Sequence, residues 1–97
     1  MNERLKILRD YFPTAVFMGD KLVFISADSR VELTEHRRED FANDQTTPFI
    51  RVRQFIKTAE GKFEPGHYED FVITDISDLA GEIEKYVLFT VGISLKE

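Results

Sequence analysis

The stretch Pro48-Phe49-Ile50-Arg51-Val52-Arg53-Gln54-Phe55-Ile56-Lys57 decides the fold of this chain. Written as a β-strand, it sends successive side chains to opposite faces of a sheet. One face carries aliphatic side chains typical of a core, with one glutamine among them: Ile50, Val52, Gln54 and Ile56. The other face alternates rings with cations: Phe49, Arg51, Arg53, Phe55 and Lys57. The alternation predicts a strand that covers the core with one face only.

The basic and aromatic face of this strand has two interpretations. Rings that stack on bases, interleaved with cations that follow a phosphate backbone, are what a surface needs to bind single-stranded nucleic acid. In the alternative, the rings cover the margin of the core and the basic side chains lie in water, paired with some of the 18 acidic residues. Both interpretations stay open, because periodicity identifies a strand better than it identifies a ligand.

Length and composition predict a single domain that spans residues 1–97. Hydrophobic residues make up 42% of the chain, which is enough for a packed core, and the lack of cysteine excludes disulfides and thiolate chemistry. The net charge of −5 argues against coating nucleic acid by overall attraction, although an acidic body can carry a local basic face. No signal peptide or membrane span is recognisable, so we expect a cytoplasmic protein without membrane contact.

The chain before the central strand predicts a helix, a hairpin and an irregular segment. Residues 2–12 have apolar side chains at helical spacing, and Pro13 ends that helix. Residues 14–18 and 21–27 are rich in valine, isoleucine and phenylalanine, and the Gly-Asp pair between them predicts a two-residue turn. Residues 28–47 are the least regular part of the chain.

Within this irregular segment, residues 30–35 alternate like a strand, residues 41–45 suggest a loop, and a short helix over 33–41 is the competing interpretation. Arg37 and Arg38 either extend a cationic patch or pair with the two acids that follow them on a solvated surface.

The chain after the central strand predicts a second hairpin, whose turn is signalled by Gly61. Pro65-Gly66 predicts a further tight turn, after which residues 68–74 resume as a strand. Asp75 or Ser77 caps a helix over 76–85.

Apolar and other residues then alternate from Val87 to Leu95, which predicts a terminal strand. The expected fold is therefore α+β. It is an antiparallel twisted sheet of five to six strands, with an N-terminal helix and a helix before the last strand.

The sequence offers no constellation typical of an enzyme, and we expect no catalytic activity and no cofactor. His36 and His67 are 31 residues apart without ligand spacing, so they do not predict a metal site. None of the serines lies in a nucleophile-elbow pattern, and no glycine-rich phosphate loop or dinucleotide fingerprint is present.

Part of the chain resembles the positive-cofactor-four family of transcriptional coactivators, which bind single-stranded DNA. The resemblance rests on Val52-Arg53-Gln54-Phe55 at a strand end, Gly61-Lys62 in a turn, Pro65-Gly66 at a bend, and a strand that leads into a helix. It covers residues 30–87. The chain departs from the family where His67-Tyr68-Glu69-Asp70 replaces a basic pair, and where an extra strand is expected after the helix.

This resemblance implies a dimeric, curved antiparallel sheet that holds melted DNA on its open face. Together with the strand pattern, it leads us to expect a transcription-related protein that binds single-stranded DNA or RNA as a homodimer. The candidate binding residues are Arg51, Arg53, Phe55, Lys57, Lys62, Arg37 and Arg38. The alternative is a small protein–protein interaction or assembly subunit, of a phage or regulatory type, that works through its sheet edges without nucleic acid.

Overall fold

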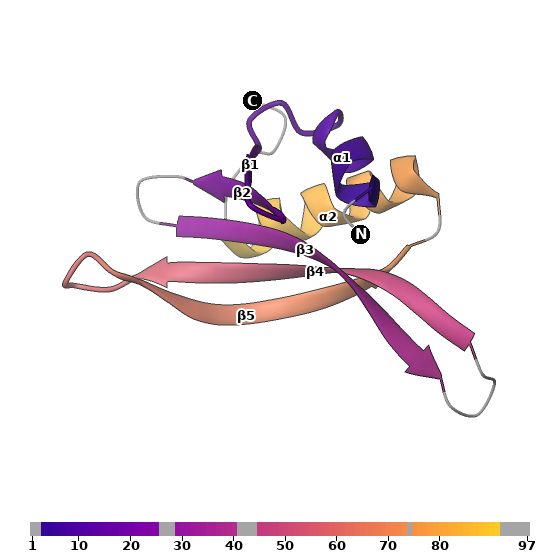
Figure 1. Cartoon of the computed structure of the whole chain (residues 1–97). Helices are drawn as coiled ribbons and strands as arrows, with labels where there is room; N and C mark the ends of the chain where they lie inside the picture. The colour runs from indigo at the N-terminus through magenta and orange to yellow at the C-terminus, as the bar shows by residue number, and fades with distance from the viewer. Residues whose placement is uncertain (1–2, 26–28, 41–44, 74, 92–97) are drawn as a thin grey trace.

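A computed structural model describes residues 3–25, 29–40, 45–73 and 75–91 of the chain (Figure 1). The described elements are two helices and five strands: α1 (Glu3–Arg9), β1 (Val16–Met18), β2 (Lys21–Ile25), β3 (Ser29–Asp40), β4 (Gln45–Lys57), β5 (Phe63–Val72) and α2 (Ile76–Val91). This arrangement confirms the α+β class and a helix near each end of the described chain. The sheet has five strands.

The strands form one antiparallel sheet in the order β1-β2-β3-β4-β5, so each strand pairs with its neighbours along the chain. Gly19 and Gly61 make the predicted turns possible, because both adopt a positive φ that side chains disfavour. The long strands β3 and β4 pair from Ser29↔Ile56 to Asp40↔Gln45, and β5 joins β4 only from Phe49 onward. The central strand predicted from residues 48–57 therefore lies between two long partners.

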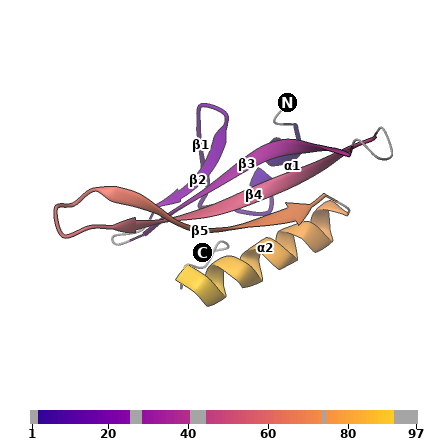
Figure 2. The same cartoon turned by 90° about the horizontal axis from the view of Figure 1, so that it is seen from below.

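Both helices lie on the same face of the sheet and close the core there. Figure 2 shows α2 running along one side of β4 and β5. The apolar stripes of α1 and α2 meet the inward side chains of β2, β3 and β4 in one buried cluster, which includes Leu8, Phe24, Leu33, Val52 and Ile83. Arg4 at the start of α1 donates its backbone N–H to Glu35 Oε1 at 3.1 Å, which ties α1 to β3 on this side. We call the opposite side of the sheet the open face.

The terminal strand predicted from Val87 to Leu95 is wrong, because α2 continues as a helix through Val91. Leu79, Ile83 and Val87 are all buried, and they are spaced four residues apart as one helical stripe requires. Phe89, which the strand pattern placed beside Val87, is 93% exposed. Residues 92–95 of the predicted strand lie outside the described residues.

The tight turn predicted at Pro65-Gly66 is also wrong, because β5 runs through it as one strand. The register instead shifts by one residue, from Phe55↔Pro65 to Arg53↔Tyr68, which is a β-bulge. Gly66 faces the Gln54 carbonyl so closely that an added Cβ would lie 3.4 Å from its oxygen. A bulge absorbs the extra residue without reversing the chain.

The irregular segment resolves in favour of a strand. β3 extends from Ser29 to Asp40, so the competing helix over residues 33–41 is wrong. Most of the predicted loop, residues 41–44, lies outside the described residues, and Gln45 already belongs to β4. Among the described helices, none is long and apolar enough to cross a membrane.

Candidate nucleic-acid interface

The open face is built from alternate side chains of the five strands, on the side away from α1 and α2. In β4 the neighbours Ile50 and Val52 are buried in the core, which places Arg51 and Arg53 on the open face as predicted. Phe55 and Lys57 continue the same alternation along β4, with Phe55 half-buried and Lys57 exposed. Four of the predicted binding residues thus share one face of one strand.

Arg51 forms the best-defined polar contact of the open face. Its Nε donates to Asp70 Oδ1 at 2.8 Å and its Nη2 donates to Asp70 Oδ2 at 3.1 Å. This hydrogen bonding, opposed by some desolvation and helped by the charge of Asp70, raises the pKa of Arg51 above its ordinary value. The guanidinium also lies 4.4 Å from the centre of the Tyr68 ring. Asp70 and Tyr68 thus fix the position of the Arg51 side chain.

Arg53 lies against the same tyrosine from its position directly opposite in the register. Its Cζ is 4.7 Å from the Tyr68 ring centre, within the range of a cation–π interaction. Tyr68 itself is 50% exposed. In the part of the chain that the structure describes, no carboxylate lies within ion-pair distance of Arg53. Its charge is therefore available to an anion from solution.

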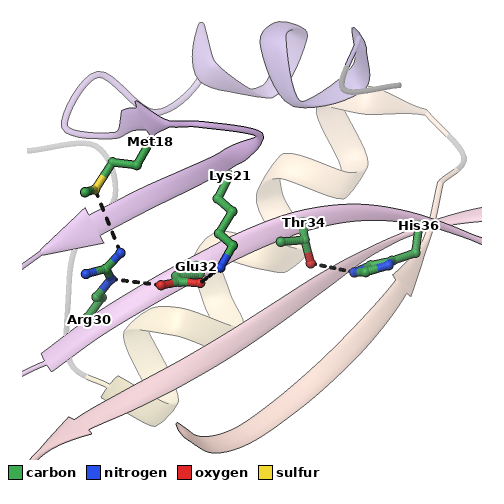
Figure 3. A network of polar contacts seen from close by, with 6 residues as sticks. All are labelled: Met18, Lys21, Arg30, Glu32, Thr34 and His36. Atoms are coloured by element: carbon green, nitrogen blue, oxygen red, sulfur yellow. Dashed lines mark hydrogen bonds and ion pairs between the residues drawn. The ribbon is translucent and has the colours of Figure 1, made fainter. Parts of the chain in front are cut away.

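A second ion cluster lies on β2 and β3 (Figure 3). Glu32 is only 7% exposed, and its two carboxylate oxygens lie 3.1 Å from Lys21 Nζ and 2.9 Å from Arg30 Nε. The Arg30 Nε contact is an ion pair without hydrogen-bond geometry, whereas Arg30 Nη2 donates to the sulfur of Met18 at 3.8 Å. Glu32 is thus enclosed by two cations that remain nearer to solvent.

Phe49 is covered by its neighbours and offers little ring surface to a ligand. It is 7% exposed, and the His36 ring stacks on it with centroids 5.3 Å apart and planes 21° apart. His36 Nε2 is in turn 2.6 Å from Thr34 Oγ1 (Figure 3). Of the two phenylalanines on this face of β4, only Phe55 is open enough to stack on a base.

Of the remaining predicted cations, Lys62 and Arg37 lie apart from the open-face residues of β4. Lys62 is exposed in the turn between β4 and β5, where its backbone N–H donates to Thr58 Oγ1 at 3.3 Å. Arg37 is exposed and follows the same alternation as Glu35, which faces α1, so it belongs to the other side of the sheet. Arg38 lies opposite Thr47 in the β3–β4 register. The structure thus separates Lys62 and Arg37 from the β4 residues.

Sequence reasoning missed three residues of the open face, namely Lys21, Arg30 and Tyr68. Lys21 and Arg30 were visible only as charges at strand ends, because their meeting over Glu32 depends on the β2–β3 register. Tyr68 was assigned to a strand, but its facing side depends on the bulge at Gly66. The predicted hairpin across Gly61 was the one available signal for Tyr68, since it pairs β5 with β4 and so brings Tyr68 near the arginines of β4.

Charge is sorted between the two sides of the molecule. The described side chains of the open face include five cations and two acids: Lys21, Arg30, Arg51, Arg53, Lys57, Glu32 and Asp70. The chain as a whole carries −5. Both acids lie in ion pairs with these cations, so the outermost charges on this face are mainly positive. An acidic protein thus presents one basic surface.

No group of three or more histidine or acidic side chains that could hold a metal ion occurs among the described residues. Comparison of the chain with protein-family models, with curated proteins and with solved structures gave no match.

Proposed function

We propose that this protein binds single-stranded nucleic acid, DNA or RNA, on the open face of its sheet, as a cytoplasmic, transcription-related regulator. The observation that carries the proposal is the charge of the open face, since five cations among its described side chains gather on a chain whose net charge is −5. Arg53 and Lys57 have no ion pair within the described chain, so they can contact phosphates. Phe55 and Tyr68 add rings at the same place.

A further feature supports the proposal. Both described helices pack on the other side of the sheet, so an extended strand of nucleotides can lie across β3, β4 and β5 without displacing a described element.

The test is fluorescence anisotropy with labelled oligo-deoxythymidine and oligouridine over a range of salt concentrations. Contacts to two or three phosphates give a slope of log affinity against log salt between about −1.4 and −2.1. Arg53→Gln should make the slope shallower by about 0.7 and weaken binding about eightfold at about 50 mM salt. Phe55→Ala should weaken binding at an unchanged slope, because stacking releases no counterions.

Lys85→Gln is the matched control, since Lys85 is an exposed cation on α2, in the other layer. It should change the affinity less than twofold. The proposal fails if the wild-type protein binds neither oligonucleotide at low salt, or if Lys85→Gln weakens binding as much as Arg53→Gln does.

A second candidate function, self-assembly, is favoured by one observation at the end of α2. Leu88 is 53% exposed and Phe89 is 93% exposed, which is unusual for large apolar side chains that follow each other on a helix. Burial of both against a second copy of the chain would make a homodimer. Light scattering on the wild type and on Phe89→Ser separates the two states: a wild-type monomer at high concentration would contradict this assembly.

A further inference from the structure

Two carboxylates on the open face form ion pairs with cations that the proposed function would use. The two differ in how far they are enclosed by the protein. Glu32 lies on β3, which has a strand on each side, and its carboxylate is paired with Lys21 and Arg30. Asp70 lies on β5, an edge strand of the sheet, and its side chain is more exposed than that of Glu32. Asp70 is thus the less enclosed of the two carboxylates.

The contact between Arg51 and Asp70 has the geometry of phosphate recognition. Two nearly parallel N–H groups of one guanidinium meet two oxygens of one anion, at 2.8 and 3.1 Å. A phosphodiester offers two non-bridging oxygens that fit the same fork. The Asp70 carboxylate thus lies where a phosphate would bind Arg51.

Two aromatic rings contact the Arg51 guanidinium in addition to Asp70. Its guanidinium rests on Tyr68 at 4.4 Å and reaches Phe49 at 5.7 Å from the ring centre. Neither contact involves the Asp70 side chain. Arg53 lies two residues along the same face, so a chain of nucleotides that contacts Arg53 also passes Arg51.

We propose that Asp70 is an internal competitor for a phosphate subsite at Arg51, which the nucleic-acid backbone must displace in order to use that guanidinium. The inference rests on the proposed function, because it assigns a ligand to one position within the same face. Arg53 and Lys57 then provide the phosphate contacts that are open from the start. Arg51 provides a further contact only when Asp70 yields, which limits the affinity of the wild-type protein.

The decisive variant is Asp70→Asn, which keeps the size of the side chain and removes its charge. At about 50 mM salt it should bind labelled oligo-deoxythymidine about eightfold more tightly than the wild type, and its salt slope should become steeper by about 0.7. In a background of Arg51→Gln, the same substitution should change the affinity less than twofold. This coupling separates competition for Arg51 from a general gain of positive charge.

Glu69→Gln is the matched control, because Glu69 precedes Asp70 on β5 but faces α2, where its charge acts on Tyr86. It removes the same charge from the other side of the sheet and should leave the affinity within twofold. Thermal unfolding of each variant checks that β5 remains folded. If Asp70→Asn binds no more tightly than the wild type at an unchanged slope, Asp70 is only a structural link between β4 and β5.

A second readout distinguishes failure of this inference from failure of the proposed function. The arginine Nε–H resonance of Arg51 is followed by NMR while inorganic pyrophosphate is added to the wild type and to Asp70→Asn. The inference predicts a shift at a pyrophosphate concentration at least several times lower in the variant. If no oligonucleotide binds but this shift occurs, Arg51 is an anion-binding subsite and the proposed nucleic-acid binding is wrong. If the Arg51 resonance does not respond in the variant, the subsite is refuted.

Discussion

Asp75 caps the N-terminus of α2 with its side chain. Its Oδ1 accepts hydrogen bonds from the Ser77 hydroxyl at 2.7 Å and from the backbone N–H groups of Ser77 and Asp78 at 3.0 and 3.2 Å. The sequence offered Asp75 and Ser77 as alternative caps, and the geometry selects Asp75. We predict that Asp75→Ala lowers the midpoint of thermal unfolding by about 5 °C, because the cap is lost.

The same contacts give the stability a pH dependence with a defined sign. The Ser77 hydroxyl, followed by the two backbone N–H groups, lowers the pKa of Asp75 below its ordinary value. The folded protein therefore binds this proton less readily than the unfolded chain, and the stabilisation is complete above the unfolded pKa of about 4. It is lost as the pH falls from about 4 through the lower pKa of the folded state.

Chemical denaturation between pH 6 and pH 2 measures this loss. Asp75→Asn should flatten the acid limb of the stability curve relative to the wild type. Asp20→Asn is the control, because Asp20 is exposed in the β1–β2 turn and makes no hydrogen bond or ion pair within the described chain. An acid limb that is identical in the wild type and Asp75→Asn would contradict the assigned cap.

At the scale of elements, two glycines have opposite roles. Gly81 lies inside α2, where an added Cβ meets nothing within 4 Å, whereas Gly61 forms the β4–β5 turn with a φ of +83°. Gly81→Ala should raise the free energy of unfolding by about 1 kcal/mol, because alanine restricts the unfolded chain and favours a helix. Gly61→Ala should lower it by about 1 kcal/mol or more. Urea denaturation measures both, and a loss of stability in Gly81→Ala would argue against helix at that position.

The end of α2 gives the sharpest test of one element against another. In a strand, Val87 and Phe89 would share a face and respond alike to substitution, but in the helix Val87 is buried and Phe89 is 93% exposed. We predict that Val87→Ala costs about 2 kcal/mol of unfolding free energy, whereas Phe89→Ser stays within about 0.5 kcal/mol. Dilute samples in urea denaturation exclude effects of self-association. Equal losses in the two variants would favour the strand.

A comparison of β4 with the end of α2 shows which parts of the fold can be predicted from sequence patterns. The alternation of residues 48–57 identified β4 and its two faces, because apolar and basic residues differ strongly there. Residues 76–95 satisfy a helical period first and a period of two afterwards, so the pattern alone does not decide where the helix ends. Val87 is buried in the core cluster that α2 shares with α1 and the strands, and this long-range packing keeps the chain helical there.

The bulge at Gly66 explains why the partners of Arg51 and Arg53 were not predicted. Without the shift, the register from Lys57↔Phe63 would continue to place Glu69 and His67 opposite these two arginines. With it, Asp70 and Tyr68 take those positions, and every side chain of β5 beyond Gly66 changes face. A Pro-Gly pair in the sequence is typical of turns, so the pattern predicted a reversal where one residue was merely absorbed.

At the scale of the whole molecule, the basic face and the acidic remainder act on a nucleic acid at different distances. The open face attracts phosphates at contact, while the net charge of −5 repels a polyanion before contact. The repulsion could be predicted from the composition. The attraction at contact could not, because cations scattered along the sequence gather on one face only when the strands pair in their register. Approach should therefore be slower than the contact surface alone would allow.

This opposition predicts a kinetic effect of acids that never touch the ligand. Asp10 and Glu82 are exposed, on the turn after α1 and on α2, and neither forms an ion pair within the described chain. The double variant Asp10→Asn with Glu82→Gln should raise the association rate constant for oligo-deoxythymidine about two- to threefold at about 10 mM salt, where the Debye length is about 30 Å. The dissociation rate constant should stay unchanged, because the contacts on the open face remain the same. Stopped-flow fluorescence measures both rates.

The gain in the association rate constant should vanish at about 150 mM salt, since the Debye length is then about 8 Å and charges on the helical layer are screened from the ligand. A change in the dissociation rate, or a gain that persists at the higher salt, would mean that Asp10 or Glu82 lies in the binding surface, and would move the interface away from the open face of the sheet.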